Sequence, residues 1–266
     1  MLCHGSDSRS QAWAAQGGRG VDVQHGALPA ELREEARPAD LPDAGLTAAV
    51  RWLSRLLGVK PASEALSADL RRRIRASFEA SAADEEHFPS TIDPRIFHVR
   101  LVLQHLGADL GGKRVLDAGC GKARFARVLL AERPGVRVVG MDLAEAMLRF
   151  VPQGVMPVGG ALTELPFASG SFDGAYATES LEHAVEIEKA VAELCRVVKP
   201  GGRIVVIDKN AAQWGRLETP EWERWFSREE MERMLRRHCR RVQSREISYW
   251  EDVPPDGLFL AWLAEK

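Results

Sequence analysis

The sequence has few cysteines, and none of them form a pair at metal-ligand spacing. The four cysteines, at positions 3, 120, 195 and 239, are scattered along 266 residues. Zinc sites use closely spaced ligand pairs, and disulfide frameworks belong to short, cysteine-dense chains. The seven histidines contain no His-x-x-x-His pair of the kind that binds zinc on a helix. We therefore expect reduced thiols and no metal site.

Long apolar runs and an excess of one charge are also absent. The 36 basic and 38 acidic side chains give a net charge of −2, which argues against binding to nucleic acid or to anionic membranes. The most apolar stretches, 203–207 and 257–263, fall short of the roughly 18 apolar residues that a membrane span needs. The polar, glycine-rich N-terminal stretch lacks the apolar run that a secretory signal peptide contains. We expect a cytoplasmic protein with no membrane span and no nucleic-acid partner.

The chain divides into three regions by composition and periodicity. Residues 1–45 are rich in Gly, Ala, Ser, Gln, Arg and Pro and have no sustained period, so we expect this segment to be disordered. Residues 46–110 have apolar side chains at helical spacing, as in 46–57 and 94–106, and predict a helical cap region. Residues 111–266 form the predicted core domain.

The core domain alternates short β-branched runs with helical segments. Such an alternation predicts a doubly wound α/β fold with a mostly parallel sheet. The last two strand-like runs, 242–250 and 257–264, are separated by a short turn with two prolines and must pair antiparallel. We predict seven strands with an antiparallel edge strand, preceded by N-terminal helices. The other expected strands are 114–118, 136–141, 155–158, 174–178 and 202–208, and the expected helices are 123–132, 144–150, 187–198 and 228–238.

A glycine-rich motif follows the first strand of the core domain. Residues 115–121 read Val-Leu-Asp-Ala-Gly-Cys-Gly, and glycines at this place allow the backbone to approach a ligand closely. The carboxylate of Asp117 suits a cation or a zwitterion better than a pyrophosphate. A dinucleotide fingerprint needs a third glycine five residues after Gly119, where this chain has Arg124. The motif therefore disfavours a nicotinamide cofactor.

An acidic residue ends the second strand. Asp142 follows Asp117 by one helix and one strand of the predicted pattern, and a carboxylate at this strand end can accept hydrogen bonds from two ribose hydroxyls. Together with the glycine-rich motif, it predicts a nucleoside-containing ligand.

Residues 113–209 resemble the class I S-adenosylmethionine-dependent methyltransferases, in particular the small-molecule type 11 branch, which includes enzymes of ubiquinone and menaquinone synthesis. The resemblance rests on the motif at 115–121, Asp142, Leu165-Pro166-Phe167, the Thr178 to His183 segment and the Lys199-Pro200-Gly201 turn. It implies a Rossmann-like fold, S-adenosyl-L-methionine as cofactor and a small-molecule methyl acceptor. The expected cofactor-binding residues are Asp117, Ala118, Gly119, Cys120, Gly121, Asp142, Leu143, Ala161, Leu162, Thr178 and Glu179.

Two positions depart from the pattern of that family. Ala123 stands where the family often has a third glycine, which should only tighten the turn. Residues 158–163 contain no acid that would contact the adenine amino group, and the first acid is Glu164. Backbone groups near Ala161 and Leu162 are therefore expected to make that contact.

His183 is the candidate catalytic residue. It lies just past the fourth strand, where the acceptor should bind, and an imidazole can remove a proton from a phenol or hydroxyl acceptor near neutral pH. The structural alternative is a histidine at a helix start that bonds a neighbouring carbonyl.

Aromatic side chains could line the ligand-binding crevice that we expect where the parallel strands end. Trp222, Trp225 and Phe226 could fold over it, or they could simply pack along one helical face. Phe78, His87, Phe88, Phe97 and His98, in the helical region, could form the opposite wall.

We therefore expect methyl transfer from S-adenosylmethionine to O, N or C of a small metabolite. The alternative is a protein that binds S-adenosylmethionine without transferring a methyl group, either a cyclase- or decarboxylase-like enzyme or a non-catalytic partner subunit. The acceptor and the oligomeric state are left open by the sequence.

Overall fold

A seven-stranded sheet organises residues 67–266, the part of the chain that the computed structural model describes. The expectations for residues 1–45 and for a helix at 46–57 lie outside the described residues. The strands are β1 (Arg114–Ala118), β2 (Arg137–Asp142), β3 (Val155–Gly159), β4 (Phe172–Thr178), β5 (Val198–Lys209), β6 (Arg241–Ile247) and β7 (Phe259–Glu265). The helices are α3 (Ala68–Ala80), α4 (Phe97–Leu106), α5 (Arg124–Glu132), α6 (Glu145–Leu148), α7 (Ile187–Val197) and α8 (Arg228–Arg236), with short 3-10 turns η2 (Leu181–His183) and η3 (Ala211–Gln213).

The strand order is β3-β2-β1-β4-β5-β7-β6. Strands β1 to β5 are parallel, and β7 runs antiparallel to both β5 and β6. The predicted doubly wound, mostly parallel sheet with antiparallel pairing at one edge is confirmed. The strand that runs against the others, β7, is inserted one position in from the edge, and β6 is outermost.

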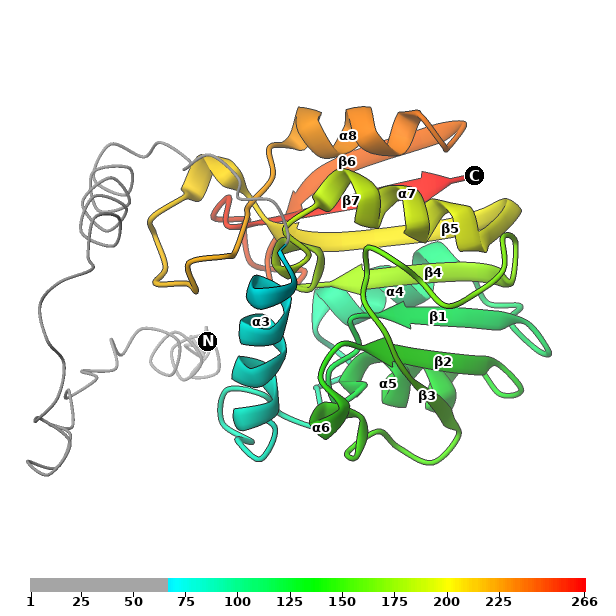
Figure 1. Cartoon of the computed structure of the whole chain (residues 1–266). Helices are drawn as coiled ribbons and strands as arrows, with labels where there is room; N and C mark the ends of the chain where they lie inside the picture. Colours follow the sequence, from blue (N-terminus) through cyan, green and yellow to red (C-terminus); the bar gives the residue numbers. More distant parts are fainter. Residues whose placement is uncertain (1–66) are drawn as a thin grey trace, which may run out of the picture. The chain divides into compact units, whose positions relative to one another are not determined.

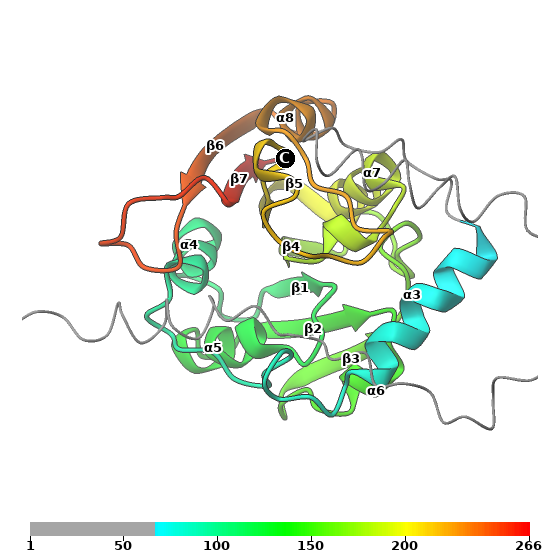
Figure 2. The same ribbon diagram turned by 90° about the vertical axis from the view of Figure 1, so that its left-hand side faces the viewer.

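Helices cover both faces of the sheet (Figures 1 and 2). Leu194 of α7 and Leu235 of α8 pack in one apolar cluster with Leu116 of β1. Val102 of α4 packs in the other cluster with Val115 of β1. Because successive strand residues point to opposite faces, β1 contributes to both cores. This two-sided burial explains the near-continuous apolar character of the central strands.

Helix α3 stands beside the edge at which the parallel strands end (Figure 1). The Ser67 side chain caps it by accepting a hydrogen bond from the Leu70 N–H at 3.0 Å, a common helix start. Leu70 and Ile74 are buried, and Phe78 packs against the same cluster. The predicted helical region thus contributes α3 and α4 within the described residues. No helix of residues 67–266 combines the length and apolar character that a membrane crossing requires.

Candidate functional site

A cavity of about 640 Å³ opens at the carboxyl ends of the parallel strands. Its walls come from the segments that follow β1, β2, β3, β4 and β5, from α3 and the segment after it, and from the segment 217–223. The strand order changes direction between β1 and β4, and in open α/β sheets ligands bind at such a switch point. The topology therefore places the cavity where the sequence motifs converge.

The loop after β1 is held against β2 by its backbone. The N–H groups of Gly119 and Cys120 donate to the Met141 carbonyl at 2.8 and 3.0 Å. Gly119 has φ +73°, and a Cβ placed there would lie 2.5 Å from the Ser180 Cβ. Glycine is thus required at this position by both its conformation and its packing.

Asp142 at the end of β2 is oriented by two backbone donors. Its Oδ2 accepts from the Gly121 N–H at 2.8 Å, and its Oδ1 from the Ala144 N–H at 2.9 Å. Burial raises the pKa of Asp142, and these N–H bonds oppose that shift. Each oxygen keeps a lone pair, so the carboxylate can still accept hydroxyl groups from a ligand in the cavity.

Asp117 and Ala118 lie behind the cavity wall rather than along it. Their exposed fractions are 2% and 0%. Burial raises the pKa of Asp117 to about 7, and the neighbouring Asp142 acts in the same direction. A cationic group arriving near this end of β1 would favour the ionised form of Asp117.

The other expected cofactor residues line the cavity, namely Gly119, Cys120, Gly121, Asp142, Leu143, Ala161, Leu162, Thr178 and Glu179. Ala161 closes a tight turn by accepting a hydrogen bond from the Glu164 N–H at 3.0 Å. Glu179 has φ +52°, and its Oε1 lies 3.4 Å from an Arg124 guanidinium nitrogen.

Lys122, within the glycine-rich loop, lines the cavity but was not predicted as a site residue. Its side chain is 1% exposed, and its ammonium donates to Glu85 Oε1 at 2.7 Å and to the Asp84 carbonyl at 3.2 Å. This contact holds the pKa of Glu85 down, at about 2. Through these hydrogen bonds, Lys122 connects the segment that follows α3 to the loop after β1. No local signal distinguishes such a lysine from a solvated one.

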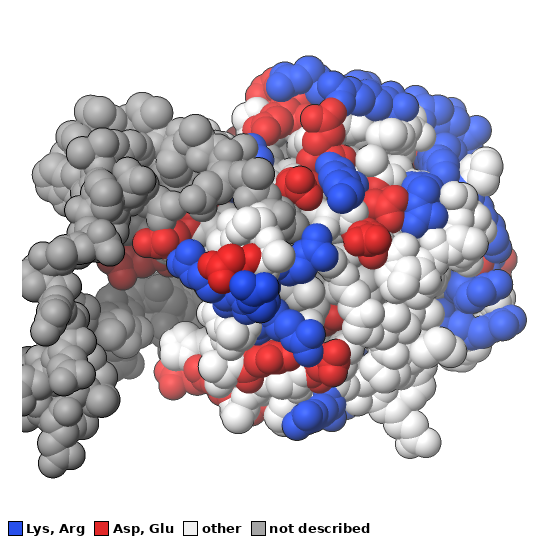
Figure 3. Space-filling model, viewed as in Figure 1, with Lys and Arg blue, Asp and Glu red and all other residues white. Residues whose placement is uncertain are grey.

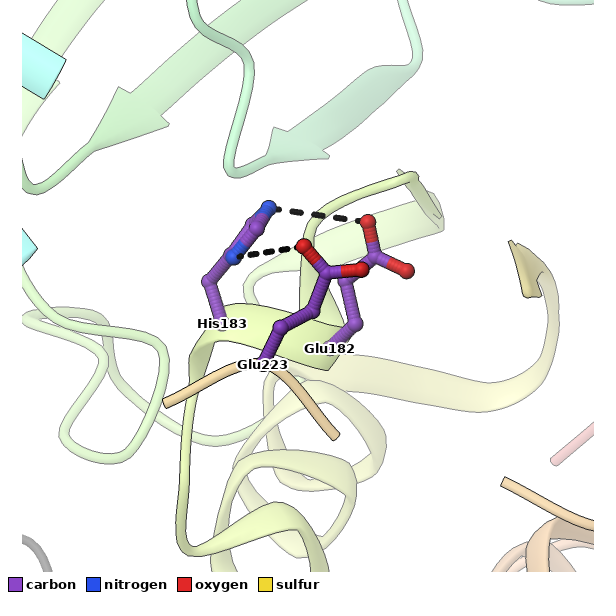
Figure 4. Close-up of side chains that lie close together, drawn as sticks. All are labelled: Glu182, His183 and Glu223. Carbon is purple, nitrogen blue, oxygen red and sulfur yellow. Dashed lines mark ion pairs between the residues drawn. The ribbon is translucent and has the colours of Figure 1, made fainter. Parts of the chain in front are cut away.

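His183 also lines the cavity, and its two ring nitrogens face the carboxyl groups of Glu182 and Glu223 (Figure 4). Its Nε2 is 3.5 Å from Glu182 Oε1, and its Nδ1 is 3.8 Å from Glu223 Oε2. The Phe78 ring of α3 meets the imidazole edge-on, with centroids 5.0 Å apart. The imidazole Nδ1 has no hydrogen-bond partner among the described residues, so the structural alternative of a carbonyl-bonded histidine is not seen at that nitrogen.

Lys209 joins the two carboxyl groups that flank His183. Its Nζ lies 2.5 Å from Glu182 Oε1 and 2.9 Å from Glu223 Oε1. Burial disfavours the ammonium, but Glu182, Glu223 and Asp208 outweigh burial and raise the pKa of Lys209. The ion pairs with Glu182 and Glu223 therefore favour the charged ammonium over the neutral amine that a base would need.

Glu182 lies against a second buried acid, Asp208. Burial, together with Asp208, raises the pKa of Glu182 well above its usual range. Burial also raises the pKa of Asp208 to about 6. Both shifts favour retention of one proton by this pair.

Glu182, His183 and Glu223 are close enough for a cation to be considered between them. One potential donor atom of each lies within 4.8 Å of the others. The Lys209 ammonium already contacts both carboxyl groups and supplies the neutralising charge. We therefore interpret this group as a charge-paired cluster. Glu223 was missed by sequence reasoning, because it lies far from His183 along the chain with no motif around it.

The aromatic residues divide between the cavity and the core. Phe78, His87, Phe88 and Trp222 line the cavity. Trp225 and Phe226 are fully buried, so packing is the correct interpretation for those two. Phe97 and His98 are also buried and do not line the cavity; His98 instead stacks on Tyr249 with centroids 4.5 Å apart.

Charged side chains of both signs are interspersed over the face shown in Figure 3. Around α3, Arg73 pairs with Glu221 and Arg75 with Glu79. The basic residues of α8 gather along the top of this view, but α8 also carries glutamates, one of which pairs with Arg236.

Comparison with known proteins yields one family and several relatives. Residues 116–206 match the family model described as a methyltransferase domain, type 11. A malonyl-[acyl-carrier protein] O-methyltransferase of Methylococcus capsulatus is 33% identical over 108 residues, covering 38% of each chain. The ubiquinone/menaquinone biosynthesis C-methyltransferase UbiE of Syntrophotalea carbinolica is 33% identical over 105 residues, 37% of this chain and 44% of that protein.

Solved structures share the fold. One, from Thermotoga maritima, is described as an S-adenosylmethionine-dependent methyltransferase, possibly a histamine N-methyltransferase. It superimposes with a TM-score of 0.56 at 20% identity, covering 73% of this chain and 99% of that one. The chain spans less than half the length of the two curated relatives, so the relationship concerns the sheet and its motifs.

Proposed function

We propose, from the match of residues 116–206 to the family model described as a methyltransferase domain, that this protein transfers a methyl group from S-adenosyl-L-methionine to a small-molecule acceptor. The observation that carries the proposal is the cavity at the switch point of the sheet, with Asp142 at one end and His183 at the other. We also retain the proposal that the protein works in the cytoplasm.

The residues around β1 and β2 fit the proposed cofactor. Asp142 would accept the two ribose hydroxyls with the oxygens that Gly121 and Ala144 orient. The backbone of the glycine-rich loop would lie close to the methionine part of the cofactor. The ammonium of that part would be attracted by the ionised carboxylate of Asp117, which lies behind the cavity wall. Leu162 and the turn at Ala161 would border the adenine.

The proposed reaction requires no covalent bond between the protein and the transferred group. The sulfonium of S-adenosylmethionine supplies an activated methyl group, so the enzyme must align the acceptor and exclude water. Phe78 and Trp222 supply apolar walls for an acceptor. His183 would take the proton from a hydroxyl acceptor.

Binding of the cofactor without methyl transfer is the weaker alternative. Curated relatives that match this chain at 31–33% identity are named as O- and C-methyltransferases, which favours transfer over cyclisation or a purely structural role. The acceptors in those names belong to those proteins.

Calorimetric titration with S-adenosylmethionine and S-adenosylhomocysteine tests the proposal. We expect binding of both, and a loss of about tenfold or more in affinity for Asp142→Ala, because ribose hydrogen bonds to a charged acceptor are lost. Asp173→Ala is the matched control, since Asp173 lies near the start of β4, away from the cavity, and pairs with Lys199 at 2.6 Å. Absence of binding by the unaltered protein would contradict the proposal.

A further inference from the structure

Glu223 presents a single oxygen to His183, because its other oxygen is already occupied. Glu223 Oε1 accepts from Lys209 Nζ at 2.9 Å and from the Trp225 indole N–H at 2.7 Å. The side chain of Glu223 is 3% exposed. Two donors on one oxygen fix the rotation of the carboxylate, which leaves Oε2 facing His183 Nδ1 at 3.8 Å.

We propose that Glu223 is a positioning residue that holds the His183 imidazole with its proton on Nδ1, leaving Nε2 as the base for a hydroxyl acceptor. This inference rests on the proposed function and narrows its acceptor class to molecules with an ionisable hydroxyl beside an apolar body. The separation of Oε2 from Nδ1, 3.8 Å, exceeds a hydrogen bond, and such contacts often tighten only when the substrate is bound.

The proton and the electrons balance without another reactant. The acceptor oxygen forms a bond to the methyl carbon, and the bond between that carbon and the sulfonium sulfur breaks, with its electron pair left on sulfur. The hydroxyl proton passes to His183 Nε2. The imidazolium formed then faces the carboxylate of Glu223, which stabilises its charge.

The charged groups around His183 come from three elements. Glu182 belongs to the same 3-10 turn, Lys209 ends β5, and Glu223 comes from the segment before α8. Glu182 Oε1 also faces His183, at 3.5 Å from Nε2, but this oxygen already accepts from Lys209 Nζ at 2.5 Å, so the ammonium rather than the imidazole holds it. Asp208 lies behind Glu182, and α3 contributes the uncharged Phe78 ring. Since Lys209 pairs with both glutamates, Glu223 is fixed from the side opposite to the imidazole.

The test is the tautomer of the His183 ring, measured by ¹⁵N NMR of the full-length, histidine-labelled protein, with His183→Gln assigning the signal. In Glu223→Gln, the amide oxygen must accept from Lys209 and Trp225, so the amide NH₂ turns toward Nδ1 and forces the proton onto Nε2. We expect the Nδ1–H tautomer in the unaltered protein and the Nε2–H tautomer in this variant. Glu188→Gln is the matched control, because it makes the same change at a carboxylate of α7 that is 68% exposed and does not line the cavity.

Turnover provides the second measurement. With labelled S-adenosylmethionine and a panel of phenols, Glu223→Gln should lower kcat by about a hundredfold or more with little change in KM, whereas Glu188→Gln should leave kcat unchanged. An unchanged tautomer in Glu223→Gln would overturn the inference, as would a ring in the unaltered protein that already carries its proton on Nε2. A tautomer switch in a protein that does not bind S-adenosylmethionine would leave the positioning role intact and refute the proposed function.

Discussion

The two ends of the cavity are built in different ways. At the proposed cofactor end, backbone groups of one loop bond directly to the adjacent strand, and the carboxylate of Asp142, which lines the cavity, is fixed by N–H donors. At the proposed acceptor end, side chains from α3, η2, β5 and the segment before α8 meet around His183. An end formed by backbone groups can bind the same ligand whatever the neighbouring side chains are. An end formed by side chains can come to bind a different acceptor when those side chains are substituted.

Removing a charge from the proposed acceptor end should lower the free energy of unfolding more than removing a charge from the protein surface. Lys209→Met would leave the buried Glu182 and Glu223 without their cation, which should destabilise the protein by about 3 kcal/mol or more. Lys199→Met is the control, because Lys199 pairs with Asp173 while 44% exposed, and such surface pairs contribute about 1 kcal/mol or less. Urea unfolding measures both, and equal costs would contradict the buried pairing.

The cofactor end should instead be sensitive to backbone shape. Gly119→Ala combines a φ of +73° with a clash against Ser180, so we expect S-adenosylmethionine affinity to fall by about tenfold or more. Gly112→Ala has nearly the same φ, +72°, but no atom within 4 Å of its new Cβ. Calorimetry should therefore find unchanged affinity in that variant, although its stability should drop by about 1 kcal/mol.

The buried carboxyl group of Asp117 should make the free energy of unfolding depend on pH. The pKa of Asp117 is raised to about 7 from 3.8, so between these values the unfolded chain releases a proton that the folded chain keeps. The contribution of Asp117 to the free energy of unfolding should thus decrease as pH rises from about 4 to about 7, by at most about 1.4 kcal/mol per unit.

Asp117→Asn removes this titration. Denaturant melts at several pH values should find the variant gaining stability relative to the unaltered protein as pH rises through that window. A constant difference between the two proteins would rule out the raised pKa.

The smallest effect is expected at Ala123, where the family often has glycine. Ala123 has φ +57° and is fully buried. In Ala123→Gly, relief of roughly 1 kcal/mol of backbone strain is offset by loss of a buried methyl and by a more flexible unfolded chain. Thermal melts should detect a change below about 1 kcal/mol, and a larger gain would mean that alanine strains the loop severely.

The sequence alone determined the sheet and the residues proposed to bind the cofactor. The alternation of β-branched runs with amphipathic helices predicted the parallel strands, and the loop residues and Asp142 could be proposed because each lies next to a strand end that the pattern already locates. Even there, burial of Asp117 behind the wall required the structure, since exposure depends on what packs in front.

Only the tertiary structure decided the acceptor end. Glu223 meets His183 from a distant part of the chain, Lys122 is buried by a segment that follows α3, and Trp222 lines the cavity while Trp225 does not. No local period or motif predicts these contacts, because they form between side chains of elements that are far apart in the sequence and meet only when the chain folds.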